Sequence, residues 1–257
     1  MPSRPTHDVH AYGTIRDRPD SRDFIYTPVR IKALPALVDL SPQCPPVYNQ
    51  LKLNSCSAQA LAAAVWMAER HDGDRPVAAS RLFIYYNERA LLGETGKNDP
   101  VPLRDGFRIL ARRGVCAESI WPYRVSRYAD RPPRSAYHTA LKRRARSYQR
   151  IRQRLDHLKY CLATGYPFVM GVAVYKGQGL ESKAVRRTGR VGMPKGRKQL
   201  VGGHAVLAVG YSDRRKSFLV RNSWGRRWGI RGYFWLPYRY VTDPSLAWDF
   251  WTLRAES

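Results

Sequence analysis

The two halves of the chain differ in the spacing of their hydrophobic positions. Apolar residues recur at helical spacing from Cys56 to Arg70, and helical patterns follow within residues 81–92 and 103–114. From residue 168 onward the pattern changes to short β-branched and aromatic runs, which cover 168–175, 204–211, 217–223 and 231–237. The change of period predicts an α+β protein with two lobes, the first mostly helical and the second mostly sheet.

Local signals place several helix ends. Asn54 and Ser55 are candidate caps for the helix that begins at Cys56, and Ser80 is the candidate cap of the next one. Gly114 stands where a glycine would end the third helix. Residues 137–162 predict two further helical segments.

The first 38 residues carry little periodicity and are rich in Arg, Asp and Pro. They predict an extended N-terminal arm that is tied down through Phe24, Ile25 and Tyr26, with Tyr26 and Pro28 as candidate contacts to the rest of the protein. The remainder, 39–257, forms the folded domain, with a helical lobe over about 50–155 and a β lobe over about 156–257. A cleft between two lobes is a common place for a ligand.

Composition narrows the class of protein. The chain has 257 residues, of which 44% are hydrophobic, so it can build a core without disulfides or metals. Its cysteines show neither zinc-site nor disulfide spacing, and we expect a reducing setting and no metal or other cofactor; they are Cys44, Cys56, Cys116 and Cys161. No apolar signal segment and no membrane span is predicted. The expected location is the cytoplasm, or outside the cell by a route without an ordinary signal peptide, and the sequence leaves the oligomeric state open.

The charge is strongly positive. There are 45 basic and 20 acidic residues, and the formal net charge is +25. Such a balance favours weak binding of polyanions by long-range attraction. The basic runs, for example K-R-R-A-R at 142–146, are scattered and lie in no known nucleic-acid-binding motif.

One set of residues predicts nucleophilic chemistry. A cysteine attacks a carbonyl as its thiolate, and Cys56 stands at a predicted helix N-terminus, whose dipole favours the anion. His204 begins a predicted strand after two glycines, from which its imidazole can act as a base. Asn222 ends the partner strand of the predicted hairpin, where its side-chain oxygen can accept a hydrogen bond from His204.

Three blocks of sequence resemble the papain-like (C1) cysteine peptidases. They are Gln50 to Ala58, Gly203 to Tyr211 and Phe218 to Tyr233, and the most specific is N-S-W-G-R-R-W-G-I-R-G-Y, which begins at Asn222. Other stretches, such as D-R-P-D-S-R-D-F and S-R-L-F-I-Y-Y-N-E-R, are similar to a prokaryotic and viral branch with a short N-terminal arm. The resemblance implies a helical left lobe, an antiparallel β-barrel-like right lobe and an active-site cleft between them.

The resemblance also implies roles for individual residues. Cys56 would be the nucleophile, His204 the general base and acid, and Asn222 the residue that orients the imidazole. Gln50 would donate to the oxyanion, and Trp224 would cover the hydrogen bond between His204 and Asn222 and form a wall of the substrate site.

The chain departs from the family pattern around the nucleophile. Leu53 stands where papain has a disulfide cysteine, Ser57 replaces an aromatic residue, and Leu51 and Asn54 replace glycines. The predicted function is that of a thiol endopeptidase acting on peptides or proteins. Its arm either inhibits or regulates the enzyme or simply braces both lobes, and we favour inhibition or regulation. Two alternatives stay open: a Cys-His acyltransferase or deamidase, and a polyanion-binding protein on a peptidase scaffold.

Overall fold

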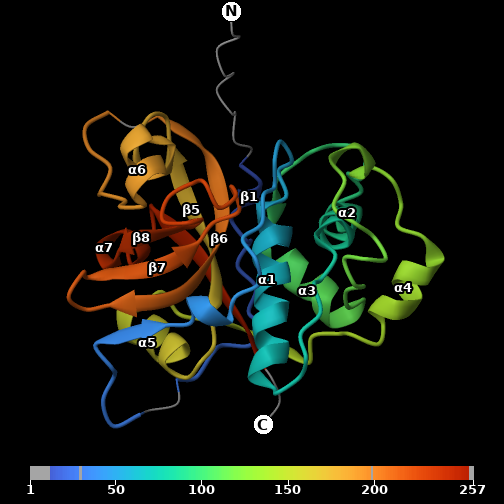
Figure 1. The fold of residues 1–257 in the computed structure, drawn as a ribbon, viewed down its shortest axis with the longest axis horizontal. Helices are drawn as coiled ribbons and strands as arrows, with labels where there is room; N and C mark the ends of the chain where they lie inside the picture. The colour runs from blue at the N-terminus through green and yellow to red at the C-terminus, as the bar shows by residue number, and fades with distance from the viewer. Residues whose placement is uncertain (1–11, 29–30, 198, 255–257) are drawn as a thin grey trace, which may run out of the picture.

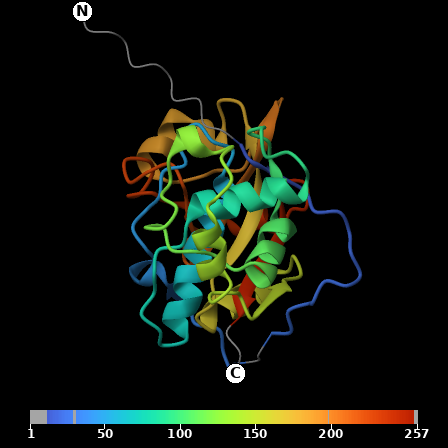
Figure 2. The same ribbon diagram turned by 90° about the vertical axis from the view of Figure 1, so that its right-hand side faces the viewer.

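The computed structural model describes residues 12–28, 31–197 and 199–254, and the helices formed by residues 56–140 gather on one side of a twisted sheet (Figure 1). The long helix α1 (Cys56–His71) lies between the sheet and the other helices of its side, α2 (Arg81–Leu91), α3 (Leu103–Arg112) and α4 (Arg134–Ala140). Figure 2 presents this helical side to the viewer. Three further helices lie on the sheet side, namely α5 (Leu155–Ala163), α6 (Lys183–Thr188) and α7 (Tyr238–Val241).

The described strands form one mixed sheet of nine strands. Its central path runs β3 (Val101–Pro102), β1 (Thr14–Ile15), β6 (Leu200–Ser212), β5 (Phe168–Tyr175), β9 (Ala247–Arg254) and β4 (Ser147–Arg150). From β6 the sheet branches to β2 (Leu37–Asp39) and to β7 (Ser217–Arg221), which pairs with β8 (Tyr233–Pro237). The α+β class is confirmed. The expected barrel is wrong, because the path ends at the edges β3 and β4 and β1 pairs parallel with β3.

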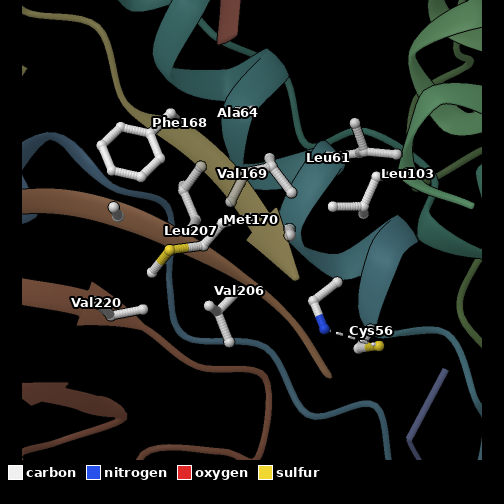
Figure 3. Close-up of a cluster of buried hydrophobic side chains, with 14 of the residues drawn as sticks. Cys56, Leu61, Ala64, Leu103, Phe168, Val169, Met170, Val206, Leu207 and Val220 are labelled. Carbon is white, nitrogen blue, oxygen red and sulfur yellow. Dashed lines mark hydrogen bonds between the residues drawn. The ribbon is translucent and has the colours of Figure 1, made fainter. Parts of the chain in front are cut away.

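The core lies between α1 and the sheet. Leu61 of α1 and Phe168, Val169 and Leu207 of the sheet are fully buried, and Figure 3 shows this cluster. The alanines on α1 let the helix approach the strands closely, and Ala58, Ala62 and Ala63 have no exposed surface. Cys56 is at the edge of the same cluster (Figure 3). The core therefore fixes the helix end that carries the nucleophile candidate.

Most predicted elements form where the pattern placed them. Of the predicted helix caps, Ser80 and Gly114 are confirmed and Ser55 is not. Ser80 caps α2 by accepting a hydrogen bond from the Phe83 N–H at 3.1 Å. Gly114 follows α3 with a φ of 70°, as expected for a C-terminal glycine. Ser55 occupies the N-cap position of α1 but makes no capping bond, because its hydroxyl is engaged with Tyr123 and Gln59 instead.

The N-terminal arm and the region before residue 155 depart from the prediction. Tyr26 is buried, whereas the side chains of Phe24 and Ile25 are 73% and 43% exposed. This stretch is tied down through its backbone, because the Phe24 carbonyl accepts the Arg150 N–H at 2.7 Å and the Tyr26 N–H donates to the Arg150 carbonyl at 2.9 Å. The arm also adds strand β1 to the sheet, and β2 crosses the predicted boundary at residue 38. Between α4 and α5 the chain forms β4, which pairs with β9, although the helical lobe was expected to extend to about residue 155.

Candidate active site

Cys56 is the first residue of α1 and is completely buried. Its sulfur accepts a hydrogen bond from the backbone N–H of Ala205 at 3.2 Å, drawn as the dashed line in Figure 3. Burial raises the pKa of the Cys56 thiol to about 11, although backbone N–H groups of Ala205, Gly13 and Ser57 act in the opposite direction. The expected effect of the helix terminus is therefore outweighed by desolvation in this arrangement.

His204 and Asn222 are brought together by the hairpin of β6 and β7. The Nε2 atom of His204 lies 2.8 Å from Asn222 Oδ1, which also accepts the Ser223 N–H at 2.8 Å. The bond from the Ser223 N–H identifies this atom as the amide oxygen, which carries no proton and can only accept, so His204 donates from Nε2 and its Nδ1 is the ring nitrogen for other partners. The imidazole is thereby held in one tautomer, as the sequence predicted for this pair.

Trp224 covers this pair. Its ring stacks on the His204 ring with centroids 4.5 Å apart and an interplanar angle of 25°, and Trp228 packs edge-on behind it at 5.2 Å. Trp224 is 5% exposed. The aromatic cover excludes water from the His204–Asn222 hydrogen bond, which strengthens it in the low local dielectric.

Gln50 is also completely buried and links the two sides of the molecule. Its Oε1 accepts from Ser223 Oγ at 2.7 Å, and its backbone N–H donates to the Ser223 carbonyl at 2.8 Å. Its Nε2 donates to the Leu53 carbonyl at 2.9 Å. These bonds hold the side-chain amide of Gln50, the predicted oxyanion donor, in the turn that leads to Cys56.

A segment of the N-terminal arm covers these residues. The Tyr12 ring lies edge-on to His204 and Trp224, with centroids 6.5 and 6.3 Å apart, and its hydroxyl bonds to Glu181. The Gly13 carbonyl accepts the Val101 N–H at 3.1 Å, and Thr14 pairs with Val101 of β3 and Gly203 of β6. Tyr26 and Pro28, the contacts that the sequence suggested, are not in this segment, and the Tyr26 N–H bonds to Arg150.

Sequence reasoning thus places Cys56, His204, Asn222, Gln50 and Trp224 in one region and misses part of their surroundings. The residues missed are Tyr12, Gly13 and Thr14 of the arm, and Ser223 and Tyr123, which bond to Gln50. Ser223 stands inside the conspicuous N-S-W-G block and could have been singled out. The short arm segment carries no periodic signal, so only its three-dimensional position reveals it.

Several negative findings concern the described residues only. No group of three or more His, Cys, Asp or Glu side chains among them is arranged to hold a metal ion. None of their helices combines the length and apolar character that crossing a bilayer requires. All four cysteines are free thiols.

Comparison with known proteins supports the resemblance. Residues 92–242 match the papain family cysteine protease model, and this range contains His204 and Asn222 but not Cys56. A peptidase C1-like protein of Acanthamoeba polyphaga mimivirus is 36% identical over 270 residues, which cover 95% of this chain and 86% of that protein. The crystal structure of xylellain, a cysteine protease from Xylella fastidiosa, has a TM-score of 0.90 and 40% identity, with both chains fully covered.

A more distant structure shares the fold. Bromelain from Ananas comosus, in complex with the inhibitor E64, has a TM-score of 0.65 at 19% identity, over 86% of this chain and all of that one. The arrangement of Cys56, His204 and Asn222 and the full-length similarity agree with one another. This chain belongs to the papain family of cysteine proteases.

Proposed function

We propose that the chain is a thiol endopeptidase that cleaves peptide bonds through an acyl-enzyme on Cys56. His204 takes the thiol proton at Nδ1, and the thiolate attacks the scissile carbonyl carbon. The Cys56 N–H and the Gln50 side-chain amide stabilise the oxyanion. His204 then gives its proton to the leaving amine, and a water molecule that His204 deprotonates hydrolyses the thioester.

The observation that carries this proposal is the pairing around the imidazole. The Nε2 atom is held by Asn222 at 2.8 Å under Trp224, while the residue after His204 donates its backbone N–H to the Cys56 sulfur. A base with a fixed tautomer beside a thiol is the arrangement that cysteine acyl transfer needs.

We also propose that the arm holds the enzyme in a latent state. Cys56 and His204 have no exposed surface beneath residues 12–14, and the pKa of the Cys56 thiol is raised by this burial. Gly13 presents an N–H group to the sulfur rather than an electrophilic carbon. The arm therefore blocks the nucleophile without offering it a bond to cleave.

Gly13 supplies a test in the full-length chain. A Cβ atom at this position would lie 1.7 Å from the Asn54 carbonyl oxygen, so Gly13→Ala must displace the arm from the site. Gly96→Ala is the matched control, because a Cβ there has no neighbour within 4 Å. Turnover of a fluorogenic peptide amide under reducing conditions is measured for the unmodified chain and both variants, each with and without Cys56→Ala.

The expected result is that Gly13→Ala turns over substrate at least about tenfold faster than the unmodified chain and the Gly96→Ala control. Cys56→Ala should abolish turnover in every background. Equal turnover with and without Gly13→Ala would be compatible with the proposed peptidase activity but would contradict inhibition by the arm. Turnover that survives Cys56→Ala would reject Cys56 as the nucleophile.

The other acyl-transfer chemistries differ only in the molecule that enters the thioester. Product analysis separates them: hydrolysis releases a free carboxylate, a transferase joins the acyl group to an added amine, and a deamidase releases ammonia from a glutamine side chain. The family match and the intact Trp224 block favour hydrolysis of peptide bonds.

A further inference from the structure

A network of buried and half-buried polar side chains supports the oxyanion side of the site. Its members come from the turn before α1, from α1 and α2, and from the loop after α3. They are Ser55, Gln59, Arg81, Glu118 and Tyr123.

Tyr123 is the point where this network meets the site. Its hydroxyl donates to the Gln50 carbonyl at 2.8 Å and lies 2.6 Å from Ser55 Oγ. A phenol has one proton, and the Gln50 carbonyl can only accept it, so Ser55 must donate to the Tyr123 oxygen. Ser55 in turn accepts a hydrogen bond from Gln59 Nε2 at 3.2 Å. The bonds run in one direction, from Gln59 through Ser55 and Tyr123 to Gln50.

The Tyr123 ring is fixed independently of its hydroxyl. Its backbone N–H donates to Glu118 Oε1 at 2.8 Å, and the guanidinium of Arg81 lies over the ring, 4.6 Å from the centroid. The same Arg81 donates to Glu118 at 2.6 Å and to Gln59 Oε1 at 3.3 Å. Two contacts, the bond to Glu118 and the Arg81 guanidinium, thus hold Tyr123 without the help of its hydroxyl.

The two partners of the hydroxyl lead directly to the two proposed oxyanion donors. Gln50 carries the side-chain amide, and Ser55 precedes the residue whose N–H is the second donor. Ser223 holds Gln50 from the sheet side, at both its side chain and its backbone. Tyr123 is the matching support from the helical side.

We propose that Tyr123 is a positioning residue that sets the distance between Gln50 and the Cys56 N–H, and so aligns the oxyanion-binding groups. This inference rests on the proposed acyl-enzyme function. A displacement of either donor weakens a bond that forms only when the carbonyl oxygen gains charge, so the effect belongs to the transition state.

Tyr123→Phe removes the hydroxyl and keeps the ring, with its packing and its Arg81 contact. Tyr137→Phe is the matched control, since Tyr137 is a tyrosine of the same lobe whose hydroxyl bonds to Asn87 at 3.3 Å, away from these residues. Both are made in the full-length chain and in its Gly13→Ala form. Three readouts are compared: kcat and KM for a peptide amide, inhibition by a peptide aldehyde, and the rate of Cys56 alkylation by iodoacetamide.

For Tyr123→Phe, kcat should fall about tenfold or more while KM stays within about twofold. Binding of the aldehyde, whose adduct carries an oxyanion, should weaken by a similar factor. Alkylation, which needs the thiolate but no oxyanion support, should be unchanged. Ser55→Ala should reduce kcat less, and the double variant should be no worse than Tyr123→Phe alone, because both act through one chain of bonds.

Hydrogen exchange gives a readout that does not need turnover. Backbone amides of residues 50–56 should exchange faster in Tyr123→Phe at an unchanged melting temperature. Retention of kcat within twofold, or an equal loss of kcat, alkylation rate and melting temperature, would overturn the proposal. Turnover that survives Cys56→Ala is the separate sign that the proposed function itself fails.

Discussion

At the scale of single residues, Glu88 is the most unusual side chain outside the site. It is completely buried, Ser57 Oγ donates to its Oε2 at 3.0 Å, and its Oε1 has no hydrogen-bond partner among the described residues. Leu61 and Gly106 enclose the carboxyl so closely that a Cβ on Gly106 would lie 2.4 Å from Oε1. Burial raises the pKa of Glu88 to about 8, so the folded protein holds it protonated at neutral pH.

Glu88→Gln should make the stability less dependent on pH. The folded pKa is raised, so the stabilising contribution of proton binding is complete below the unfolded pKa, near 4.3, and is lost as the pH rises toward 8. Relative to the unmodified chain, the glutamine variant should gain about 1 kcal/mol or more between pH 5 and pH 8. Denaturant melts at both pH values measure this, with Glu94→Gln, on an exposed carboxyl, as control. If the free energy of unfolding of Glu88→Gln changed with pH as much as that of the unmodified chain, Glu88 would be ionised in the folded protein.

The orienting residue gives a second prediction at this scale. Asn222→Ala removes the acceptor for His204 Nε2, so the imidazole can rotate and change tautomer. We expect kcat to fall about tenfold or more with a smaller change in KM. The variant is compared with Asn98→Ala, whose side chain bonds to the turn before α1 and to Tyr85, and not to His204. Unchanged kcat in Asn222→Ala would remove Asn222 from the proposed mechanism.

Among single residues, the hydrogen bond between His204 and Asn222 was predicted from the sequence and is present in the structure. Cys56, His204 and Asn222 are marked by residue types that acyl-transfer chemistry requires, and the N-S-W-G block fixes their neighbours. Tyr123 and Glu88 carry no comparable mark. Their significance comes from what lies within 3 Å of them, and that depends on tertiary packing rather than on spacing along the chain.

At the scale of elements, the Ser80 cap stabilises the N-terminus of α2. Ser80 Oγ accepts the Phe83 N–H and also donates to the Trp121 carbonyl at 2.6 Å. Ser80→Ala should lower the free energy of unfolding by about 1 to 2 kcal/mol, measured by denaturant melts. Ser135→Ala, an exposed serine in α4, should change it by less than about 0.5 kcal/mol. Similar losses in both variants would contradict the capping role.

The arm is anchored at a second place, by buried charges. Asp17 accepts from Trp251 Nε1 at 2.8 Å, and its backbone N–H donates to Asp249 Oδ2 at 2.6 Å. Arg104 and Arg150 face this cluster, together with Asp23. Burial raises the pKa of Asp17 and raises that of Asp249 to about 6, so docking of the arm takes up protons.

The sign of this linkage predicts how inhibition depends on pH. The docked form gains stability below the ordinary aspartate pKa and loses it as the pH rises through about 6, so the arm should hold more tightly at pH 4.5 than at pH 7. The activity ratio of Gly13→Ala to the unmodified chain, measured at both pH values, should therefore be larger at pH 4.5. Asp249→Asn should remove most of the difference. A larger activity ratio at pH 7 would contradict the proposal that docking of the arm takes up protons.

The helices and longer strands were predicted from the sequence better than the short strands. The long helices and the strands β5 to β8 have strong periodicity and formed as expected. Strands β1 to β4 are two to four residues long and owe their conformation to pairing with strands far away in the sequence, which no local pattern records. No local pattern records the open edges of the sheet either, and the family resemblance suggested a barrel-like sheet there.

At the scale of the whole molecule, the net charge of +25 is the property without an assigned purpose. Residues Lys142, Arg144 and Arg146 line one shallow surface hollow together with apolar neighbours. We expect weak polyanion binding here, and an affinity for inorganic polyphosphate that falls steeply between 50 and 200 mM salt. Turnover of an uncharged peptide by Gly13→Ala should change little over this range. Replacing the three cations by Glu should weaken binding, and salt-independent binding would exclude an electrostatic origin.

In the proposed latent state, the arm segment that lies over Cys56 acts as a ligand tethered to its own site. A covalently linked segment reaches its site at an effective concentration on the order of millimolar, whatever the concentration of the protein. Dilution should therefore not relieve inhibition. A detached peptide of residues 12–28, added to the Gly13→Ala chain, should restore inhibition only near millimolar concentration. Latency of this kind is a property of each single molecule, and activation requires an event that acts on the tether or on the segment it carries.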